Sequence, residues 1–129
     1  MLLIPVRVDR SAIHGLGAFA VHPIPKGTEV WRFTSGFDLD LDPARLDLLP
    51  DLAQESLLHY GYIDPRFGRF ILCCDDARFL NHSDTPNLAA DFSLDRHGVD
   101  VAARDIEAGE ELTVDYASVE GERPGAGGR

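Results

Sequence analysis

The sequence predicts a mostly β fold of the α+β class with one short helical insert. Short apolar runs, separated by Gly, Pro and Asp, recur along the 129 residues, and this pattern is typical of many short strands. Only residues 43–59 break the pattern. The length suits one compact domain, which we place at residues 1–117, and the Gly-rich residues 118–129 predict a flexible tail.

Eight strands are expected in chain order, and turn residues separate them. They cover residues 6–9, 18–21, 28–33, 60–63, 69–73, 88–94, 99–103 and 111–115. The segments 64–68 and 95–98 contain Asp and Gly, which favour tight turns. We therefore expect each of these two segments to connect a β-hairpin.

The helical insert has its own start and stop signals. Asp42 can cap a first helical turn that begins at Pro43. Pro50 interrupts the pattern, and Asp51 can then cap a second helix.

Residues 20–30 resemble residues 102–112, since each segment runs from an apolar strand through Ile-x-x-Gly into a second strand. Gly27 and Gly109 stand where the turn tolerates a positive φ. The two similar units suggest internal pseudo-symmetry, and a common solution to a tight turn explains the likeness equally well.

The charge balance favours a basic protein as partner. The formal net charge is -10, from 22 acidic against 12 basic residues, and duplex binding needs clustered Lys and Arg that the sequence does not show. No apolar run approaches the roughly 18 residues of a membrane span, and the N-terminus does not read as a secretory signal. We expect no direct contact with nucleic acid or membrane, and a cytoplasmic, nuclear or nucleoid-associated location.

The chain has two cysteines, Cys73 and Cys74, which are adjacent in an apolar segment. Two adjacent cysteines can build neither a disulfide framework nor a zinc cluster. The favoured interpretation is a pair of partly buried structural thiols. The alternative is a thiol hydrolase in which one of them acts with His82 and an Asp.

Three short motifs could carry chemistry. The first, residues 14–17, is His-Gly-Leu-Gly, whose glycines let the backbone approach a ligand closely. The second is Asn81-His82, an amide beside an imidazole, and both can hydrogen bond to a base or an amino-acid head group. The third, residues 109–116, is an expected strand that ends on Tyr116. Each motif alone is also typical of an ordinary turn or a packing residue.

Together and in this order, the three motifs resemble the SET domain family over residues 6–116. The resemblance implies a β-clip of several small sheets with a pseudoknot near the C-terminus. It also implies an S-adenosylmethionine-dependent protein-lysine N-methyltransferase.

The resemblance further implies a cofactor site, a substrate channel and one catalytic residue. The backbone of the glycine motif would hold the methionine part and ribose of the cofactor, and Asn81 and His82 would bind its amino-acid head and adenine. Tyr60 is the expected further contact, although Tyr62 fits the spacing almost as well, and one of the two would line the lysine channel. The implied cofactor-binding residues are His14, Gly15, Leu16, Gly17, Tyr60, Asn81 and His82, with Tyr62 and Val114 at the channel and Tyr116 as the catalytic residue.

In the implied reaction a neutral lysine amine displaces the methyl group from the sulfonium of the cofactor. Free lysine has a pKa of about 10.4, so a dry channel beside a positive charge must lower it. Tyr116 would orient the amine without acting as a general base, because its hydroxyl is mostly protonated at neutral pH. Many relatives carry Phe or Tyr at the position of Val114, so the number of methyl groups added stays open.

The sequence departs from many relatives at the zinc-binding cysteines. Asp84 stands where they have the first of these cysteines, and no cysteine follows Tyr116. We therefore expect no zinc. A partner subunit in a homodimer, or the substrate itself, would then close the lysine channel. The expected substrate is a Lys/Arg-rich histone, histone-like or ribosomal protein, and the alternative function is a catalytically silent β-clip binding module.

Overall fold

The computed structural model describes residues 1–119 and consists mostly of short strands in four small sheets. The predicted flexible tail, 118–129, lies outside the described residues except for its first two positions. The strands are β1 (Val6–Arg10), β2 (Leu16–Ala20), β3 (Glu29–Trp31), β4 (Leu39–Leu41), β5 (Tyr62–Asp64), β6 (Arg69–Leu72), β7 (Asn81–His82), β8 (Leu88–Asp91), β9 (Val99–Ala102) and β10 (Thr113–Val114). The predicted mostly β class is confirmed, and each expected strand has a counterpart with shifted ends.

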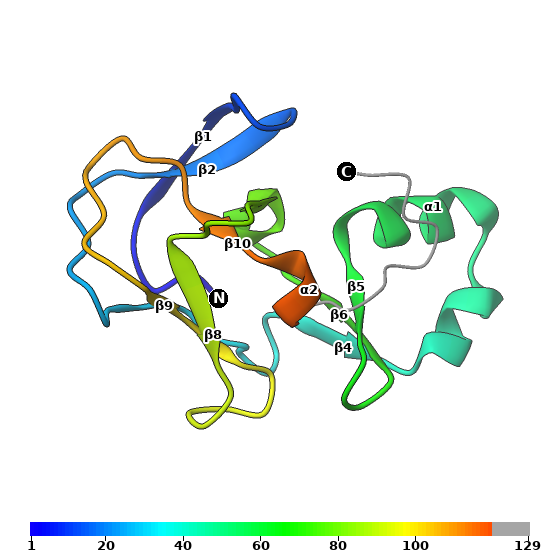
Figure 1. Cartoon of the computed structure of the whole chain (residues 1–129). Coiled ribbons are helices and arrows are strands. Elements are labelled where there is room, and N and C mark those ends of the chain that lie inside the picture. Colours follow the sequence, from blue (N-terminus) through cyan, green and yellow to red (C-terminus); the bar gives the residue numbers. More distant parts are fainter. Residues whose placement is uncertain (120–129) are drawn as a thin grey trace.

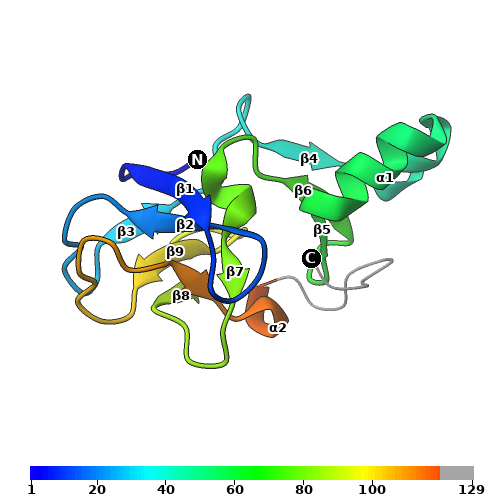
Figure 2. The same cartoon turned by 90° about the horizontal axis from the view of Figure 1, so that it is seen from above.

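The sheets form two groups (Figures 1 and 2). The antiparallel sheet β4-β6-β5 lies on one side with the helical insert. The hairpin β1-β2, the sheet β3-β9-β8 and the pair β10-β7 lie on the other side. A core of buried apolar side chains fills this second group, and a smaller cluster around Phe70 supports the first group. None of the described helices is long and apolar enough to cross a membrane.

The helical insert is present as a 3₁₀ helix, η1 (Pro43–Leu48), followed by α1 (Asp51–Tyr60). The Asp42 carboxylate accepts a hydrogen bond from the backbone N–H of Ala44, which confirms the first predicted cap. The predicted cap at Asp51 is wrong, because Asp51 is the first residue inside α1 and Pro50 occupies the cap position without a side-chain bond.

Two differences affect the site. The expected strand 60–63 begins late, because α1 continues to Tyr60 and the N–H of Gly61 still bonds to the carbonyl of Leu57. The expectation of a single helical segment is wrong, since two further short helices exist, η2 (Asp76–Phe79) and α2 (Tyr116–Val119). Tyr116 therefore begins a helical turn and does not end a strand.

The two Ile-x-x-Gly units pair with each other. Ile24 and Ile106 form an antiparallel bridge with two reciprocal backbone hydrogen bonds of 2.8 Å. Gly27 and Gly109 have φ values of +86° and +87°. Each of these glycines donates its N–H to the opposite unit, at distances of 2.8 and 2.7 Å. The units are thus arranged with the pseudo-symmetry that the sequence suggests.

The parallel pair of β7 and β10 brings two distant motifs together. Asn81 lies opposite Thr113, and His82 lies opposite Val114. The N–H of Ser83 extends the pairing with a 3.0 Å bond to the carbonyl of Val114. The segment that ends at Tyr116 is thereby fixed beside Asn81-His82. The threading of one segment past the other as a pseudoknot stays a prediction.

Candidate functional site

The glycine motif begins in the turn between β1 and β2 and continues into β2. Its two glycines are required for different reasons. Gly15 has a φ of +48°, in the region that favours glycine, and a Cβ there would meet nothing within 4 Å. Gly17 has ordinary backbone angles, but a Cβ there would overlap the carboxylate of Glu111. Gly15 is therefore needed for the turn, and Gly17 for close contact with the strand that leads to Tyr116.

Asn81 fastens this turn to the centre of the molecule. Its side-chain Nδ2 donates to the carbonyls of His14 and Leu16, at 3.0 Å each, and to Oε2 of Glu111 at 2.8 Å. The residue is buried. Because the amide nitrogen is fully used, a ligand can be bound by the amide oxygen only.

Glu111 is a structural anchor that sequence reasoning missed. Its carboxylate accepts hydrogen bonds from the hydroxyl of Ser11, at 2.7 and 2.9 Å, and from Asn81. A glutamate in an expected strand normally faces solvent, so no local pattern signals this role. Glu111 joins all three motifs, because it precedes Tyr116 in the third motif and contacts the first and second.

A cavity opens beside the turn, and we call it the loop pocket. The space open to the centres of water molecules is about 180 Å³. The pocket is lined by His14, Gly15, Leu16, His59, Tyr60, Arg78, Phe79 and Asn81. The structure thus brings together most of the residues assigned to cofactor binding, whereas Gly17 and His82 do not line this pocket. His59, Arg78 and Phe79 were missed, since nothing local in the sequence relates α1 to η2.

His82 contacts Tyr116 instead. Its Nδ1 accepts a hydrogen bond from the backbone N–H of Tyr116 at 3.1 Å, and its Nε2 lies 2.9 Å from the carboxylate of Asp84. Both contacts are met by one neutral tautomer, in which Nε2 carries the proton and Nδ1 is the acceptor. The imidazole therefore positions the backbone at the start of α2.

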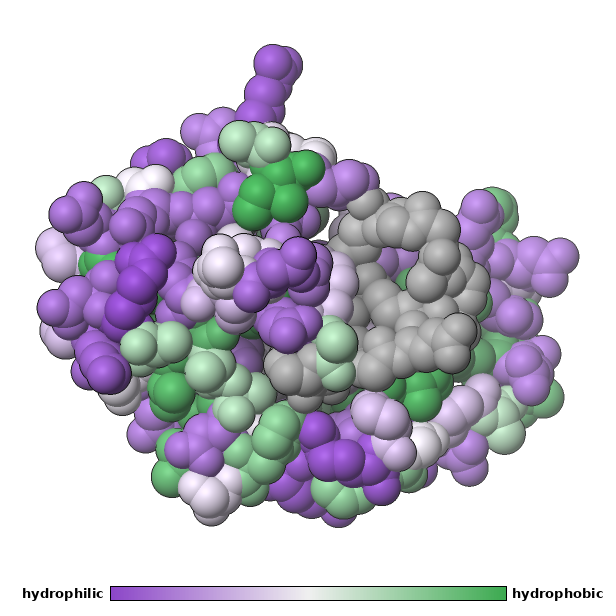
Figure 3. Space-filling model, in the orientation of Figure 1, coloured by the Kyte–Doolittle hydropathy of each residue, from purple (hydrophilic) through white to green (hydrophobic). Residues whose placement is uncertain are grey.

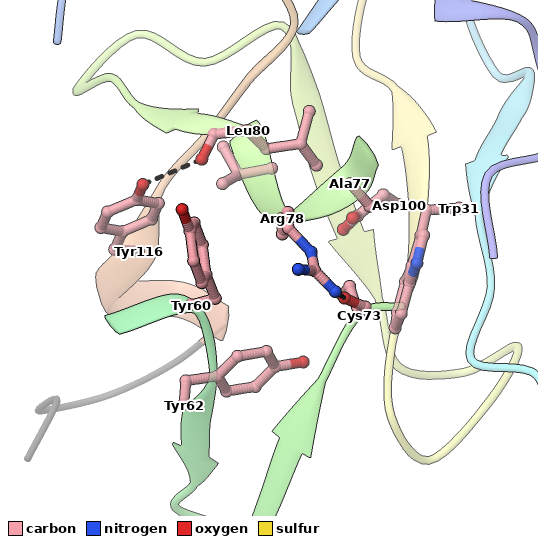
Figure 4. Close-up of a pocket in the computed structure, with 10 residues that line it drawn as sticks. Trp31, Tyr60, Tyr62, Cys73, Ala77, Arg78, Leu80, Asp100 and Tyr116 are labelled. Atoms are coloured by element: carbon pink, nitrogen blue, oxygen red, sulfur yellow. Dashed lines mark hydrogen bonds between the residues drawn. The ribbon is translucent and has the colours of Figure 1, made fainter. Parts of the chain in front are cut away.

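Tyr116 is also fixed at its far end. Its hydroxyl donates a 2.8 Å hydrogen bond to the carbonyl of Leu80, drawn as a dashed line in Figure 4. Because the proton points toward this carbonyl, the oxygen can offer only lone pairs to a ligand in the cavity.

The hydroxyl end of Tyr116 faces a second cavity, which we call the tyrosine pocket (Figure 4). It is lined by Trp31, Tyr60, Tyr62, Cys73, Ala77, Arg78, Leu80, Asp100, Val114 and Tyr116. Tyr62 and Val114, both assigned to a substrate channel, line it together with Tyr116. Tyr60 and Arg78 line both pockets. The guanidinium of Arg78 donates a 3.1 Å bond to the carbonyl of Cys73 and lies 5.2 Å from the ring centroid of Tyr60.

A glycine sets the relative positions of Tyr60 and Tyr62. A Cβ at Gly61 would overlap the ring of Phe70 and approach the carbonyl oxygen of Ile71 to 2.8 Å. The end of α1 can therefore lie against β6 only because this residue has no side chain.

The thiols do not form a nucleophilic site. Burial raises the pKa of Cys73, and the carboxylates of Asp38 and Asp100 raise it further. A thiol in this state stays protonated at neutral pH and is a poor nucleophile. Cys74 is exposed, and within residues 1–119 no hydrogen bond joins either thiol to His82. The geometry disfavours a thiol hydrolase.

Among residues 1–119 no three His, Cys, Asp or Glu side chains are grouped so that they could hold a metal ion. The expected lack of zinc stays a prediction.

Comparisons with known proteins agree with this architecture. The family model of the SET domain matches residues 15–117. A solved structure from Plasmodium falciparum, described as a candidate histone methyltransferase, matches with a TM-score of 0.58 and 19% identity, and the match covers 89% of this chain and 95% of the other. That likeness supports the fold. A search of curated proteins gave no match. Because the family model spans most of the sequence, including all but His14 of the assigned residues, the chain belongs to the SET domain family, whose members are methyltransferases.

Proposed function

We propose that this protein transfers a methyl group from S-adenosylmethionine to the ε-amine of a lysine in a basic protein. The observation that carries the proposal is the junction of the two pockets at Tyr60 and Arg78. Two reactants in neighbouring pockets with a shared wall can meet in the aligned geometry that a direct displacement needs.

The loop pocket suits the cofactor chemically. Arg78 offers a guanidinium to the carboxylate of the methionine part, and the amide oxygen of Asn81 can accept from its ammonium group. Phe79 and Tyr60 are edge-to-face aromatic rings, with centroids 6.1 Å apart, against which a flat purine can pack. Because Gly15 has no side chain, its backbone is open to the cofactor. When bound, S-adenosylmethionine supplies an electrophilic methyl group on a positively charged sulfur.

The tyrosine pocket suits a lysine side chain. Aromatic rings and the apolar side chains of Leu80 and Val114 line it, so the alkyl stem can pack without losing hydrogen bonds. The oxygen of Tyr116, whose own proton points to Leu80, can accept an N–H of the amine and hold its lone pair toward the loop pocket. Tyr116 thus orients the amine and takes no proton from it.

Electrostatics in the tyrosine pocket favour the neutral amine. Desolvation in an apolar cavity lowers the pKa of a lysine, and a nearby positive charge lowers it further. Arg78 supplies such a charge in the pocket wall. A lysine that must react as the free base is therefore brought closer to that state by binding.

Charge also indicates the substrate class. With a net charge of -10, the protein attracts Lys/Arg-rich chains such as histone, histone-like or ribosomal proteins. The face seen in Figure 3 is largely hydrophilic, with apolar groups scattered across it. The structural relative described as a candidate histone methyltransferase is consistent with a basic protein substrate.

The tyrosine pocket also bears on what closes the lysine channel and on how many methyl groups are added. We propose that substrate, or a second copy of the chain, covers the tyrosine pocket, and that zinc takes no part. Val114 lines the pocket with less bulk than Phe or Tyr would, which leaves room for an amine that already carries methyl groups.

The test is transfer of labelled methyl from S-adenosylmethionine to a panel of basic proteins, followed by mass spectrometry of the modified residue. We expect label on lysine. Calorimetry with the cofactor alone separates the alternatives: a folded protein that binds no cofactor would contradict the enzyme and favour a silent β-clip binding module.

A further inference from the structure

Two buried polar groups in the wall of the tyrosine pocket have no role in the account above. Asp100 is 6% exposed, and no residue among 1–119 donates a hydrogen bond to its carboxylate. Trp31 is 3% exposed, and its indole N–H meets no acceptor in the described part of the chain. The two residues lie opposite each other on the paired strands β9 and β3, and Figure 4 shows them on the side of the pocket away from Tyr116.

Burying polar groups without a hydrogen-bond partner costs free energy of folding. A buried polar atom without a partner loses its hydration and gains nothing in return, and an ionised carboxylate loses most. An acceptor and a donor that face one cavity are both satisfied by a water molecule, which donates to Asp100 and accepts from Trp31. The cavity has about 40 Å³ open to water centres, above the roughly 10 to 15 Å³ that one water needs.

The titratable and charged neighbours of Asp100 come from several elements. Cys73 follows β6, Arg78 lies in η2, and the amine of Met1 is close enough to act on the carboxylate. Burial raises the pKa of Asp100 to about 7, and the Met1 amine opposes that rise. The group therefore changes its charge in the neutral range, where it can both take up and release a proton.

We propose that Asp100 accepts the proton that the substrate ammonium loses before methyl transfer, through water held between Asp100 and Trp31. The proposal rests on the proposed function. An N–H bond of the ammonium breaks, its electron pair stays on nitrogen, and the proton ends on a carboxylate oxygen of Asp100. The free amine then attacks the methyl carbon, and the carbon–sulfur bond breaks with its electron pair left on sulfur. Asp100 returns its proton to bulk water after the product leaves.

Three other groups in this wall are unsuited to the task. Tyr116 donates its own proton to Leu80, and the raised pKa of Cys73 keeps its thiol protonated. Arg78 is a permanent cation that disfavours the charged amine and takes up no proton. Asp100 is the only carboxylate among the described residues that line the pocket, and it is thus the proton acceptor that the chemistry can use.

The test compares the pH dependence of kcat in the wild type and in Asp100→Asn. We expect a rising limb with an apparent pKa near 7 in the wild type. We expect Asp100→Asn to lose this limb and to be roughly 100-fold slower at pH 7.5, with the difference shrinking toward pH 10, where free lysine loses its proton unaided. Asp64→Asn is the matched control, because Asp64 is a buried carboxylate outside this pocket, paired with Arg66, and its removal should leave the limb in place.

A second measurement does not depend on activity. Carboxyl carbon NMR of the wild type should show one aspartate that titrates near pH 7 and is absent from Asp100→Asn. Titration of Asp100 near pH 4, or an unchanged pH profile in Asp100→Asn, would overturn the role of Asp100 alone. Failure of the wild type to methylate any substrate at any pH, with this NMR signal present, would instead overturn the proposed function.

Discussion

Gly15 and Gly17 are two residues apart in one turn and are fixed by different physical limits. Gly15 needs a positive φ, whereas Gly17 has no room for a side chain. The obstacle at Gly17 is the end of Glu111, which could move if it were free. It is not free, because Ser11 and Asn81 hold it by hydrogen bonds.

We therefore expect Gly17→Ala to be the more damaging of two matched variants. Displacing Glu111 should break its bonds to Ser11 and Asn81, cost about 1 to 3 kcal/mol of unfolding free energy and weaken cofactor binding at least several-fold. Gly15→Ala should cost only about 1 kcal/mol of backbone strain. Chemical denaturation and calorimetry with the cofactor measure both effects. Equal loss in the two variants would show that Glu111 is not the constraint.

Asp100 also has a consequence for stability. Its pKa is raised from 3.8 to about 7 in the folded protein, so the folded state binds the proton more tightly than the unfolded chain does. The free energy of unfolding therefore falls as the pH rises from about 4 to about 7, and the penalty is complete above that range.

Asp100→Asn removes this penalty. We expect the variant to be more stable than the wild type above pH 7, by on the order of 4 kcal/mol at most, and to match it near pH 4. Asp95→Asn is the control of opposite sign. A backbone hydrogen bond from His97 lowers the pKa of Asp95, so loss of the charged carboxylate should destabilise the protein at neutral pH. Urea denaturation across this pH range checks both, and a constant difference at all pH values would contradict the burial of an ionised Asp100.

At the scale of residues, the sequence marks some candidate site residues and carries no signal for others. Tyr116 and Asn81 stand in motifs whose order along the chain marks them. Asp100 lies in Val-Asp-Val-Ala, where an acid between apolar residues is typical of the solvent-facing side of a strand. Only the pairing of β9 with β3 and the position of η2 turn that side chain inward, and such long-range packing leaves no local pattern.

At the scale of elements, the junction of α1 and β5 determines where Tyr60 and Tyr62 lie. The sequence predicted one continuous strand there, since the apolar alternation from Tyr60 onward is typical of a strand. The helix instead continues to Tyr60, and the chain becomes extended at Gly61, which packs against Phe70.

Gly61→Ala should therefore act on catalysis as well as on folding. The added Cβ would push α1 from β6 and displace both tyrosines, and a displacement of about 1 Å can cost up to roughly 100-fold in rate. Gly68→Ala, in the turn between β5 and β6, is the matched control: it has a φ of +64° and nothing within 4 Å of a Cβ, so it should lose about 1 kcal/mol of stability and keep its kcat. Full kcat in Gly61→Ala would show that the junction tolerates the shift.

The pairing of β7 with β10 gives the ring of His82 a contact beside the cofactor contact that the resemblance implies for this residue. Its ring bonds to the backbone of Tyr116 and is absent from the wall of the loop pocket. We expect His82→Ala to lower kcat about ten-fold through a misplaced Tyr116, with little change in cofactor Kd. His22→Ala, at an exposed position, is the control for removal of an imidazole. A large rise in cofactor Kd with kcat preserved would return His82 to the cofactor site.

At the scale of the whole molecule, the strand content and the likeness of the two Ile-x-x-Gly units were predicted from local patterns, because turns and alternation are local properties. The pairing of the two units with each other was not predicted, because it joins distant residues. The division into two groups of sheets was not predicted. It depends on which strands pair, as in β4-β6-β5, and on a strand, β4, that is too short to stand out in the sequence. The pockets lie where these groups meet, so their full lining could not be read from the motifs.

We propose that the loop pocket and the tyrosine pocket form one site, in which Tyr116 orients a lysine amine toward the methyl group of the cofactor. The most direct measurement is single-turnover transfer of labelled methyl to a lysine-containing substrate by the wild type and by Tyr116→Phe, with cofactor Kd measured for both. We predict unchanged cofactor binding and a loss of at least roughly 100-fold in transfer, because only the hydroxyl that holds the amine is removed. Transfer by Tyr116→Phe at the rate of the wild type would contradict the claim.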